Sequence, residues 1–166
     1  AKPKETEFGR KVWFAEVEGG LIIEYRILAG NPPDDRHVIP SVKHHKKMFG
    51  KAPQRISGDR GLFSPDNERQ ARALGVRHVG LPQPGHKTTQ RKRKERQPWF
   101  RAARRFRNGI EGRISQLRRA RHLNRCLNHG QAGMERWIGW GVIANKLATI
   151  ALSLNRRHLS LADAIA

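Results

Sequence analysis

Apolar runs and turn residues alternate along the first part of the chain. Residues 11–17 and 21–28 are rich in β-branched and aromatic side chains, and Glu18-Gly19-Gly20 separates them. A Gly-Gly pair between two such runs is typical of a β-hairpin. We therefore expect two strands within residues 8–29.

The pattern then changes to alternating helices and short strands. Gly, Pro and Asp residues at 30–35 interrupt the sheet pattern and offer a start for a helix that ends at Phe49. A short strand is expected over residues 54–57, a helix capped by Ser64 follows, and another strand covers residues 76–81.

The second half of the chain predicts two longer helices after a mobile basic loop at residues 90–96. In the helix expected over residues 99–123, apolar side chains recur at spacings of four, four and three, at Phe106, Ile110, Ile114 and Leu117. A last helix is expected over residues 134–154, with Trp137 and Trp140 packed in the core. Strands followed by strand–helix alternation and long helices indicate the α/β class, with helices against a mixed sheet.

Charge changes this picture more than any other property. The 166 residues contain 34 Lys and Arg against 14 Asp and Glu, a formal net charge of +20. Such an excess repels itself unless a polyanion neutralises it, so nucleic acid is the expected partner. The length fits one domain over residues 1–166, with the basic segment at 87–125. Asn145 and Lys146 interrupt the last apolar helix, so we expect no membrane span.

Asp59 is the first candidate for chemistry. It follows an expected strand in Ser57-Gly58-Asp59-Arg60-Gly61, where the glycines leave room for a ligand. A carboxylate at a strand end is suited to Mg²⁺, which takes one or two protein oxygens together with substrate phosphates. The alternative is that Asp59 only caps a turn.

Glu111 is the second candidate, because it stands alone among the arginines between Arg96 and Arg125. A carboxylate among arginines can hold a metal ion while the arginines contact phosphates. The alternative is a surface ion pair with Arg107 or Arg118, which would contribute well under about 1 kcal/mol.

Several segments resemble, in order, a bacterial insertion-sequence transposase of the DDE type. They are residues 7–12, 30–34, 58–68, 106–112 and 137–148. The family signature Tyr-x2-Arg-x3-Glu-x6-Lys maps onto Arg104, Arg107, Glu111 and Arg118, so arginine stands in place of the tyrosine and of the lysine.

The resemblance implies an RNase H-like mixed sheet flanked by helices, with Asp59 and Glu111 as the second and third catalytic, metal-binding acids. No acid occupies the position of the family's first Asp, so we expect that acid and its strand to lie in a segment missing from the N-terminus. The implied activity is Mg²⁺- or Mn²⁺-dependent cleavage and strand transfer at the terminal inverted repeats of an insertion sequence, with the fragment inactive by itself. The implied setting is a homodimer on double-stranded DNA in the bacterial cytoplasm, at the nucleoid.

The expected DNA contacts are all basic and lie on the arginine-rich helix or just before it: Arg91, Lys92, Arg93, Lys94, Arg104, Arg107, Arg113 and Arg118. Trp99-Phe100, beside the basic loop, is the candidate for stacking on bases. The helix would hold the duplex backbone without reading bases.

Two other interpretations compete with this one. His44-His45 and Cys126-x2-His129 could suggest zinc, but a chain with one cysteine offers only scattered histidines for such a site. The rival function is a noncatalytic basic nucleic-acid-binding protein of the ribosomal type, whose acids are structural. The distance between the Asp59 and Glu111 carboxylates separates these two functions.

Overall fold

The computed structural model describes residues 10–120, 123 and 125–163, and these residues form five α-helices, two 3₁₀ turns and four strands. In chain order the elements are β1 (Val12–Val17), β2 (Leu21–Ile27), η1 (Asp34–His37), α1 (Val38–Phe49), β3 (Arg55–Ser57), η2 (Arg60–Leu62), α2 (Pro65–Ala73), β4 (His78–Gly80), α3 (Thr89–Glu95), α4 (Pro98–Ala120) and α5 (Gly130–Asp163). The expected hairpin is confirmed, although residues 8 and 9 of its predicted range lie outside the described part.

The strands form two separate ladders. β1 and β2 are antiparallel, with Val17 opposite Leu21 across the Gly-Gly turn. β3 and β4 are parallel, with Ile56 opposite Val79, and α2 connects them. The α/β class is therefore confirmed. A single mixed sheet is not seen among residues 10–120, because no ladder joins β1 to β3.

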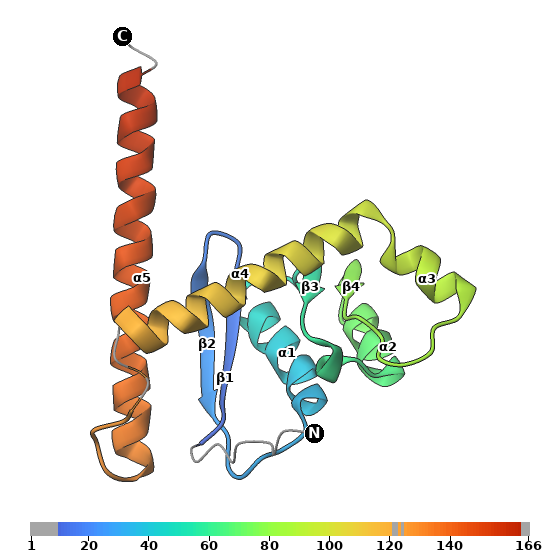
Figure 1. Cartoon of the computed structure of the whole chain (residues 1–166), viewed down its shortest axis with the longest axis horizontal. Coiled ribbons are helices and arrows are strands. Elements are labelled where there is room, and N and C mark those ends of the chain that lie inside the picture. The colour runs from blue at the N-terminus through green and yellow to red at the C-terminus, as the bar shows by residue number, and fades with distance from the viewer. Residues whose placement is uncertain (1–9, 121–122, 124, 164–166) are drawn as a thin grey trace, which may run out of the picture.

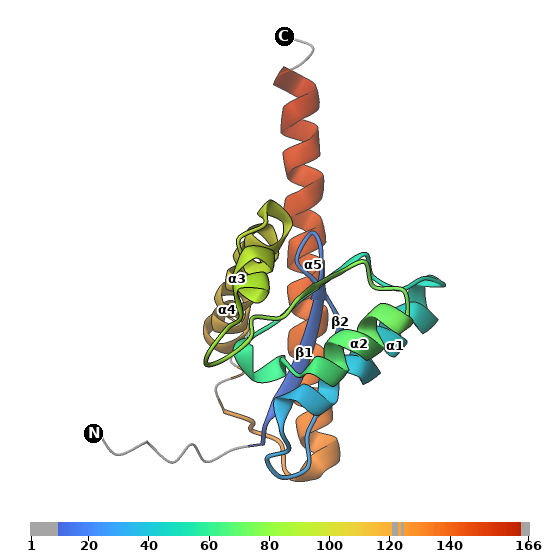
Figure 2. The same cartoon turned by 90° about the vertical axis from the view of Figure 1, so that its right-hand side faces the viewer.

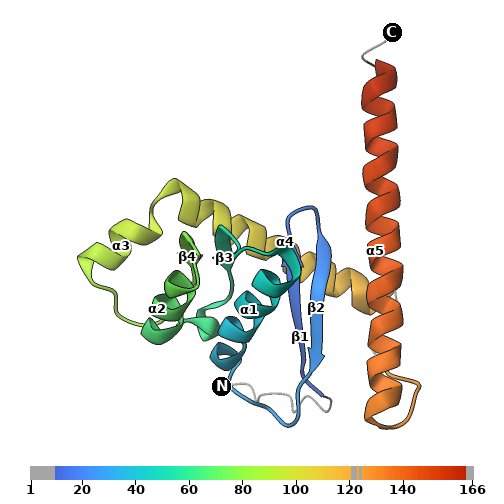
Figure 3. The same cartoon turned by 180° about the vertical axis from the view of Figure 1, so that it is seen from behind.

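Helices cover both sides of the strands. α1 and α2 lie on one side and α3 and α4 on the other (Figure 2). α4 crosses the molecule from α3 to α5, and α5 stands beside the hairpin and extends past the other elements (Figures 1 and 3). α4 consequently presents one long side to solvent.

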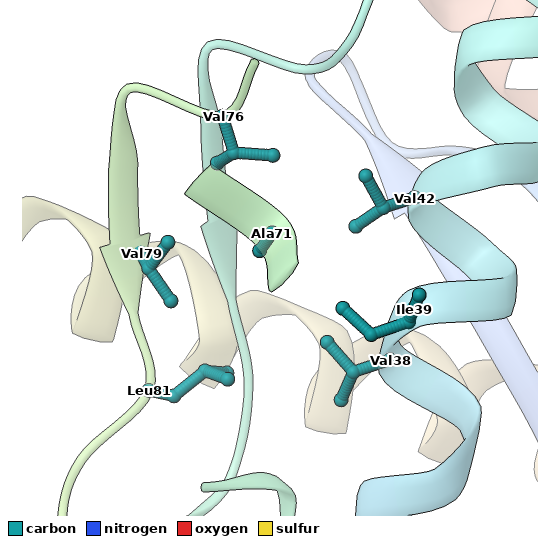
Figure 4. Packing of buried hydrophobic residues seen from close by; sticks show 7 residues of the cluster. All are labelled: Val38, Ile39, Val42, Ala71, Val76, Val79 and Leu81. Atoms are coloured by element: carbon teal, nitrogen blue, oxygen red, sulfur yellow. The ribbon is translucent and has the colours of Figure 1, made fainter. Parts of the chain in front are cut away.

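Two hydrophobic clusters stabilise this arrangement. The first lies between α1, α2 and the β3–β4 pair, and its buried members are Val38, Ile39, Val42, Ala71, Val76, Val79 and Leu81 (Figure 4). The second lies where the hairpin, α4 and α5 meet, and its buried members are Ile22, Leu117, Ile138 and Val142. α4 links the two regions, because it contacts β3 and β4 near its start and α5 near its end.

Close contact with the sheet fixes the position of α4. The Ser57 hydroxyl donates a hydrogen bond of 2.5 Å to the carbonyl oxygen of Ala103. A Cβ placed on Gly80 would lie 2.7 Å from the Ala103 Cβ and 3.0 Å from the Ile56 carbonyl oxygen. Only glycine at position 80 lets the helix approach the strands this closely.

We expect Gly80→Ala to lower the free energy of unfolding by about 1–3 kcal/mol, because overpacking against backbone cannot relax by side-chain rotation. Gly109→Ala is the matched control, because Gly109 lies within α4 and a Cβ at that position would meet nothing within 4 Å. That substitution should stabilise the helix by up to about 1 kcal/mol. Urea denaturation of both variants tests the contact, and equal effects would contradict it.

The structure corrects two expectations about the helices. Residues 90–96 are not a loop: α3 begins after Thr88, whose hydroxyl accepts a hydrogen bond of 3.2 Å from the Arg91 backbone N–H. Trp140 is not a core residue, since it is 69% exposed. α5 packs through Ile138 and Val142, and at 100° per residue Trp140 points away from that side.

Candidate nucleic-acid and metal site

Asp59 sits just beyond the carboxyl end of β3. Its Oδ1 accepts a hydrogen bond of 2.6 Å from the backbone N–H of Arg60 and so caps the turn η2. A Cβ on Gly58 would lie 2.3 Å from the Leu62 side chain, so glycine allows the turn to fold tightly there. The capping role is confirmed, yet the Asp59 side chain remains 65% exposed and can take a further ligand.

Glu111 meets Asp59 at a shared guanidinium. Nη2 of Arg107 lies 2.5 Å from Oε1 of Glu111 and 3.6 Å from Oδ1 of Asp59. The two carboxylate oxygens are therefore no farther apart than the sum of these distances. The expected ion pair between Glu111 and Arg107 is confirmed, and the two candidate acids lie on the same side of the molecule.

Helical spacing explains why these groups converge. Ala103, Arg107 and Glu111 follow one another at intervals of four, so they lie along one gradually turning side of α4. Ala103 is fixed against β3 and β4 by the Ser57 hydrogen bond and the Gly80 contact. Arg107, one turn later, then reaches the end of β3, and Glu111 lies one turn beyond it. The sheet-to-helix packing thus positions the site.

Exposed arginines flank Glu111 on α4. Arg104 precedes it by seven residues and Arg118 follows it by seven, which places each about 10.5 Å away along the helix. Arg101 and Arg119 are exposed on the adjoining side. Among the residues that the structure describes, none of these four arginines has an acidic partner. They form what we call the arginine face: Arg101, Arg104, Arg118 and Arg119.

Arg113 has a structural role instead. Its Nε donates a hydrogen bond of 2.8 Å to Glu16, whose side chain is only 4% exposed. A Cβ on Gly20 would fall 2.3 Å from the Arg113 guanidinium. Arg113 therefore lies directly against the hairpin turn and holds it to α4, so we leave it out of the proposed phosphate contacts.

Arg91 is buried within an ion cluster that sequence reasoning did not anticipate. Its guanidinium lies 2.7 Å from Glu68, 2.9 Å from Glu95, and 4.6 Å from the centre of the Phe63 ring. Lys94 also contacts Glu68. We therefore leave Arg91 and Lys94 out of the proposed DNA surface. The sequence did contain one signal for this cluster, because Glu95 is an acid inside a run of basic residues.

Hydrogen bonds determine the ionisation of Glu95. Burial by itself would raise its pKa, but hydrogen bonds from Lys87, from the Gln83 backbone N–H and from Arg91 lower the pKa below its usual value. Burial also lowers the pKa of Lys94, against the attraction of Glu95. The cluster is thus an interior feature that fixes α3, while Lys92 and Arg93 on the same helix remain exposed.

The aromatic pair at the start of α4 is largely committed to packing. Phe100 is fully buried, so it cannot stack on a base. The Trp99 ring lies 4.7 Å from the His78 ring, centre to centre. Burial, reinforced by Arg77, lowers the pKa of His78 and favours the neutral imidazole in this contact.

Residues 10–120, 123 and 125–163 contain no group of three His, Cys, Asp or Glu side chains that could hold a metal ion. Nδ1 of His45 lies 3.1 Å from the carbonyl oxygen of Lys51, and the Cys126 thiol contacts the carbonyl oxygen of Asn128. Asp59 and Glu111 form an exposed pair of carboxylates, which by itself is smaller than such a group.

A hollow of about 1010 Å³ lies elsewhere, between the hairpin turn, α4 and α5. Its α4 lining includes Arg105, Gly109 and Arg113, which point away from the side that carries Glu111. Asp59 and Glu111 instead lie on open surface. An open surface suits a duplex better than a small molecule, which needs to be enclosed.

Comparison of the chain with family models, with curated proteins and with solved structures gives no significant match.

Proposed function

We propose that this chain acts on double-stranded DNA as part of a transposase of the DDE type, with divalent-metal-dependent phosphodiester cleavage and strand transfer. The observation that carries the proposal is the meeting of Asp59 and Glu111 at Arg107. These acids come from the end of a strand and the middle of a helix, and only the tertiary fold brings them together.

The donor set fits Mg²⁺ or Mn²⁺. Both acids offer hard carboxylate oxygens, and their side chains are 65% and 62% exposed. Mg²⁺ is commonly bound by one or two carboxylates plus substrate phosphates, so a pair of acids needs the DNA to complete the site. When bound, the ion would supply activation of the attacking oxygen and stabilisation of the leaving oxygen.

Arg107 connects the two acids to the substrate. Its guanidinium lies within ion-pair distance of both carboxylates. A divalent ion between them would compete with that guanidinium, which would then be free to contact a DNA phosphate. Arginine suits this second role because its planar donors match phosphate oxygens.

The arginine face supplies duplex affinity without base readout. Arg104 and Arg118 lie along α4 on both sides of Glu111. A DNA backbone that lies along the helix would therefore contact cations on both sides of the two acids. Lys92 and Arg93 add exposed charge on α3. Each phosphate neutralised releases a counterion, which makes binding steeply salt-dependent.

The proposal also includes an RNase H-like fold for this chain. An RNase H-like fold is supported by the parallel β3–α2–β4 unit, by the acid at the end of β3 and by the helix α4 that carries the other acid across the same strands. Action at the terminal inverted repeats of an insertion sequence, assembly on DNA as a homodimer and a nucleoid location are further parts of this proposal.

A specific observation favours the rival function, a noncatalytic nucleic-acid-binding protein. Asp59 and Glu111 already have a cationic partner in Arg107, and Asp59 already has a capping role. Both acids would then serve only to position the helix.

Manganese binding to the chain in complex with a short DNA duplex tests the proposal, with electron paramagnetic resonance as the readout. Asp59→Asn and Glu111→Gln should each weaken Mn²⁺ binding by at least about tenfold, because each removes one of two charged ligands. Arg107→Gln should strengthen it, because the competing guanidinium is gone. Asp66→Asn is the control, an exposed acid that is likewise paired with an arginine.

Two outcomes overturn the metal assignment: Mn²⁺ binding that is unchanged in Asp59→Asn and Glu111→Gln, or binding lost equally in Asp66→Asn. Nicking of supercoiled DNA provides a second readout. Any Mn²⁺-dependent nicking by the wild-type chain that survives Asp59→Asn contradicts the assignment of Asp59 as a catalytic acid.

A further inference from the structure

α5 has two apolar sides, and the fold uses only one of them. Ile138, Val142 and Asn145 face the hairpin and α4 and are at most 5% exposed. Composition and length alone make residues 130–155 a candidate membrane span, although 22% of the most apolar stretch is buried inside the protein. The opposite side of the helix has no cover among the described residues.

That opposite side carries a regular apolar repeat. Large side chains recur at spacings of three, four, three and four, and each is between 46% and 69% exposed: Trp140, Ile143, Leu147, Ile150 and Leu154. We call this row the α5 seam. A three–four repeat is the heptad pattern with which two helices interlock, and none of the five seam positions carries a charge.

We propose that the α5 seam is the self-association surface of this protein and that it pairs with the α5 seam of a second copy. The inference deepens the homodimer of the proposed function by naming its surface, and its test needs neither the metal site nor DNA, so the two can fail separately. The seam lies on the side of α5 that faces away from the hairpin, and α5 itself stands at one edge of the molecule, where a second helix can lie alongside (Figures 1 and 3).

The exposed area is sufficient for a specific dimer. With about 150–250 Å² for a whole large side chain, the five residues together expose on the order of 500 Å². Two copies would then bury about 1,000 Å², which is the lower limit for a specific protein–protein interface. The interface is small, so we expect an association that depends on concentration rather than a permanent dimer.

The residues beside the seam favour a second helix as its partner over a lipid surface. Ala144 and Ala151, which flank it, are small and let a second backbone approach closely. Lys146 borders the other flank, and the hairpin packs on the far side of the helix at Ile138 and Val142. Apart from Leu152, the large exposed apolar side chains of residues 140–155 form one row, which matches one partner helix, whereas a helix that spans a membrane is apolar all round.

Sedimentation equilibrium of the full chain over a range of concentrations tests the proposal. The apparent mass of the wild-type chain should rise to twice the monomer mass, and Leu147→Glu should remain monomeric at concentrations at least tenfold higher. Leu152→Glu is the matched control: Leu152 is 55% exposed on the same helix but lies outside the seam. Its dimerisation should equal that of the wild type.

A cross-link gives a second readout that does not depend on a destabilising charge. In a Cys126→Ser background, Leu147→Cys should form a disulfide between two chains on mild oxidation, while Leu152→Cys should not. Leu147 is the middle residue of the seam, so it meets its counterpart whether the helices are parallel or antiparallel about that point.

Three results overturn the proposal. The first is a wild-type chain that stays monomeric at all concentrations. The second is a Leu152→Glu variant that loses association as strongly as Leu147→Glu. The third is a monomeric wild-type chain that sediments with anionic phosphatidylglycerol vesicles when the Leu147→Glu variant does not. The last result assigns the seam to a lipid surface instead.

Discussion

Replacement of Arg91 by alanine is expected to lower the free energy of unfolding by about 3–5 kcal/mol, the usual cost of removing one partner from a buried ion cluster. Arg91 is 8% exposed and lies against Glu68 and Glu95. Without it these two carboxylates, on different helices, lose their common cation, and the Leu81 carbonyl oxygen loses its donor. Urea denaturation measures the effect.

The control for Arg91 is its neighbour Lys92, which is exposed on the same helix. Lys92→Ala should change the free energy of unfolding by no more than about 0.5 kcal/mol. Equal losses in Arg91→Ala and Lys92→Ala would show that the cluster does not stabilise the fold.

Acid should affect the same cluster. The pKa of Glu95 is lowered in the folded protein by its hydrogen bonds, against the effect of burial. Its contribution to stability is therefore present above the unfolded value of about 4.5 and is lost as the pH falls through the lower, folded pKa. The Arg91→Ala variant should show a weaker loss of stability over this acidic range than the wild type.

A second large effect is expected for the arginine face. Substitution of Arg101, Arg104, Arg118 and Arg119 by glutamine should reduce the slope of log K against log salt by up to about 3.6, at about 0.9 per phosphate contact. At 0.1 M salt this corresponds to an affinity for duplex DNA lower by roughly a thousandfold or more. Fluorescence anisotropy at several salt concentrations measures both quantities, and circular dichroism confirms that the variant is folded.

The control removes the same number of charges from the other side of the molecule. Lys43, Lys47, Lys51 and Arg69 are exposed on and beside α1 and α2, which lie across the strands from α4 (Figure 2). Their replacement by glutamine should lower affinity far less, because these cations are outside the proposed contact. Equal losses in the two variants would mean that the net charge of +20 attracts DNA without a defined face.

Local signals explain what could be predicted of the fold. The Gly-Gly pair fixes the hairpin, because it joins two runs of strand-forming residues. The Ser64 cap is confirmed by a hydrogen bond of 3.0 Å from the Asn67 backbone N–H to its hydroxyl. The start of α3 was missed, because its many cations resembled a solvated loop and the acids that neutralise Arg91 come partly from α2.

The candidate site, like the fold, could be predicted only in part from the sequence. The position of Asp59 after a strand and the isolation of Glu111 among arginines predicted them as candidate site residues. Their meeting at Arg107 was not derivable from spacing, because it requires α4 to lie against β3, which the Gly80 contact permits. The sequence also could not separate Arg104 and Arg118, which are exposed, from Arg91, which is buried.

The sequence by itself determined the hairpin, the elements other than α3, the α/β class and the strong positive charge, because turns, caps and charge are properties of neighbouring residues or of composition. Only the tertiary structure decided which cations face solvent, which side of α5 is buried and where the two acids meet. Those features depend on contacts between segments far apart in the chain, and a helix with two apolar sides, such as α5, does not itself specify which side the rest of the protein will cover.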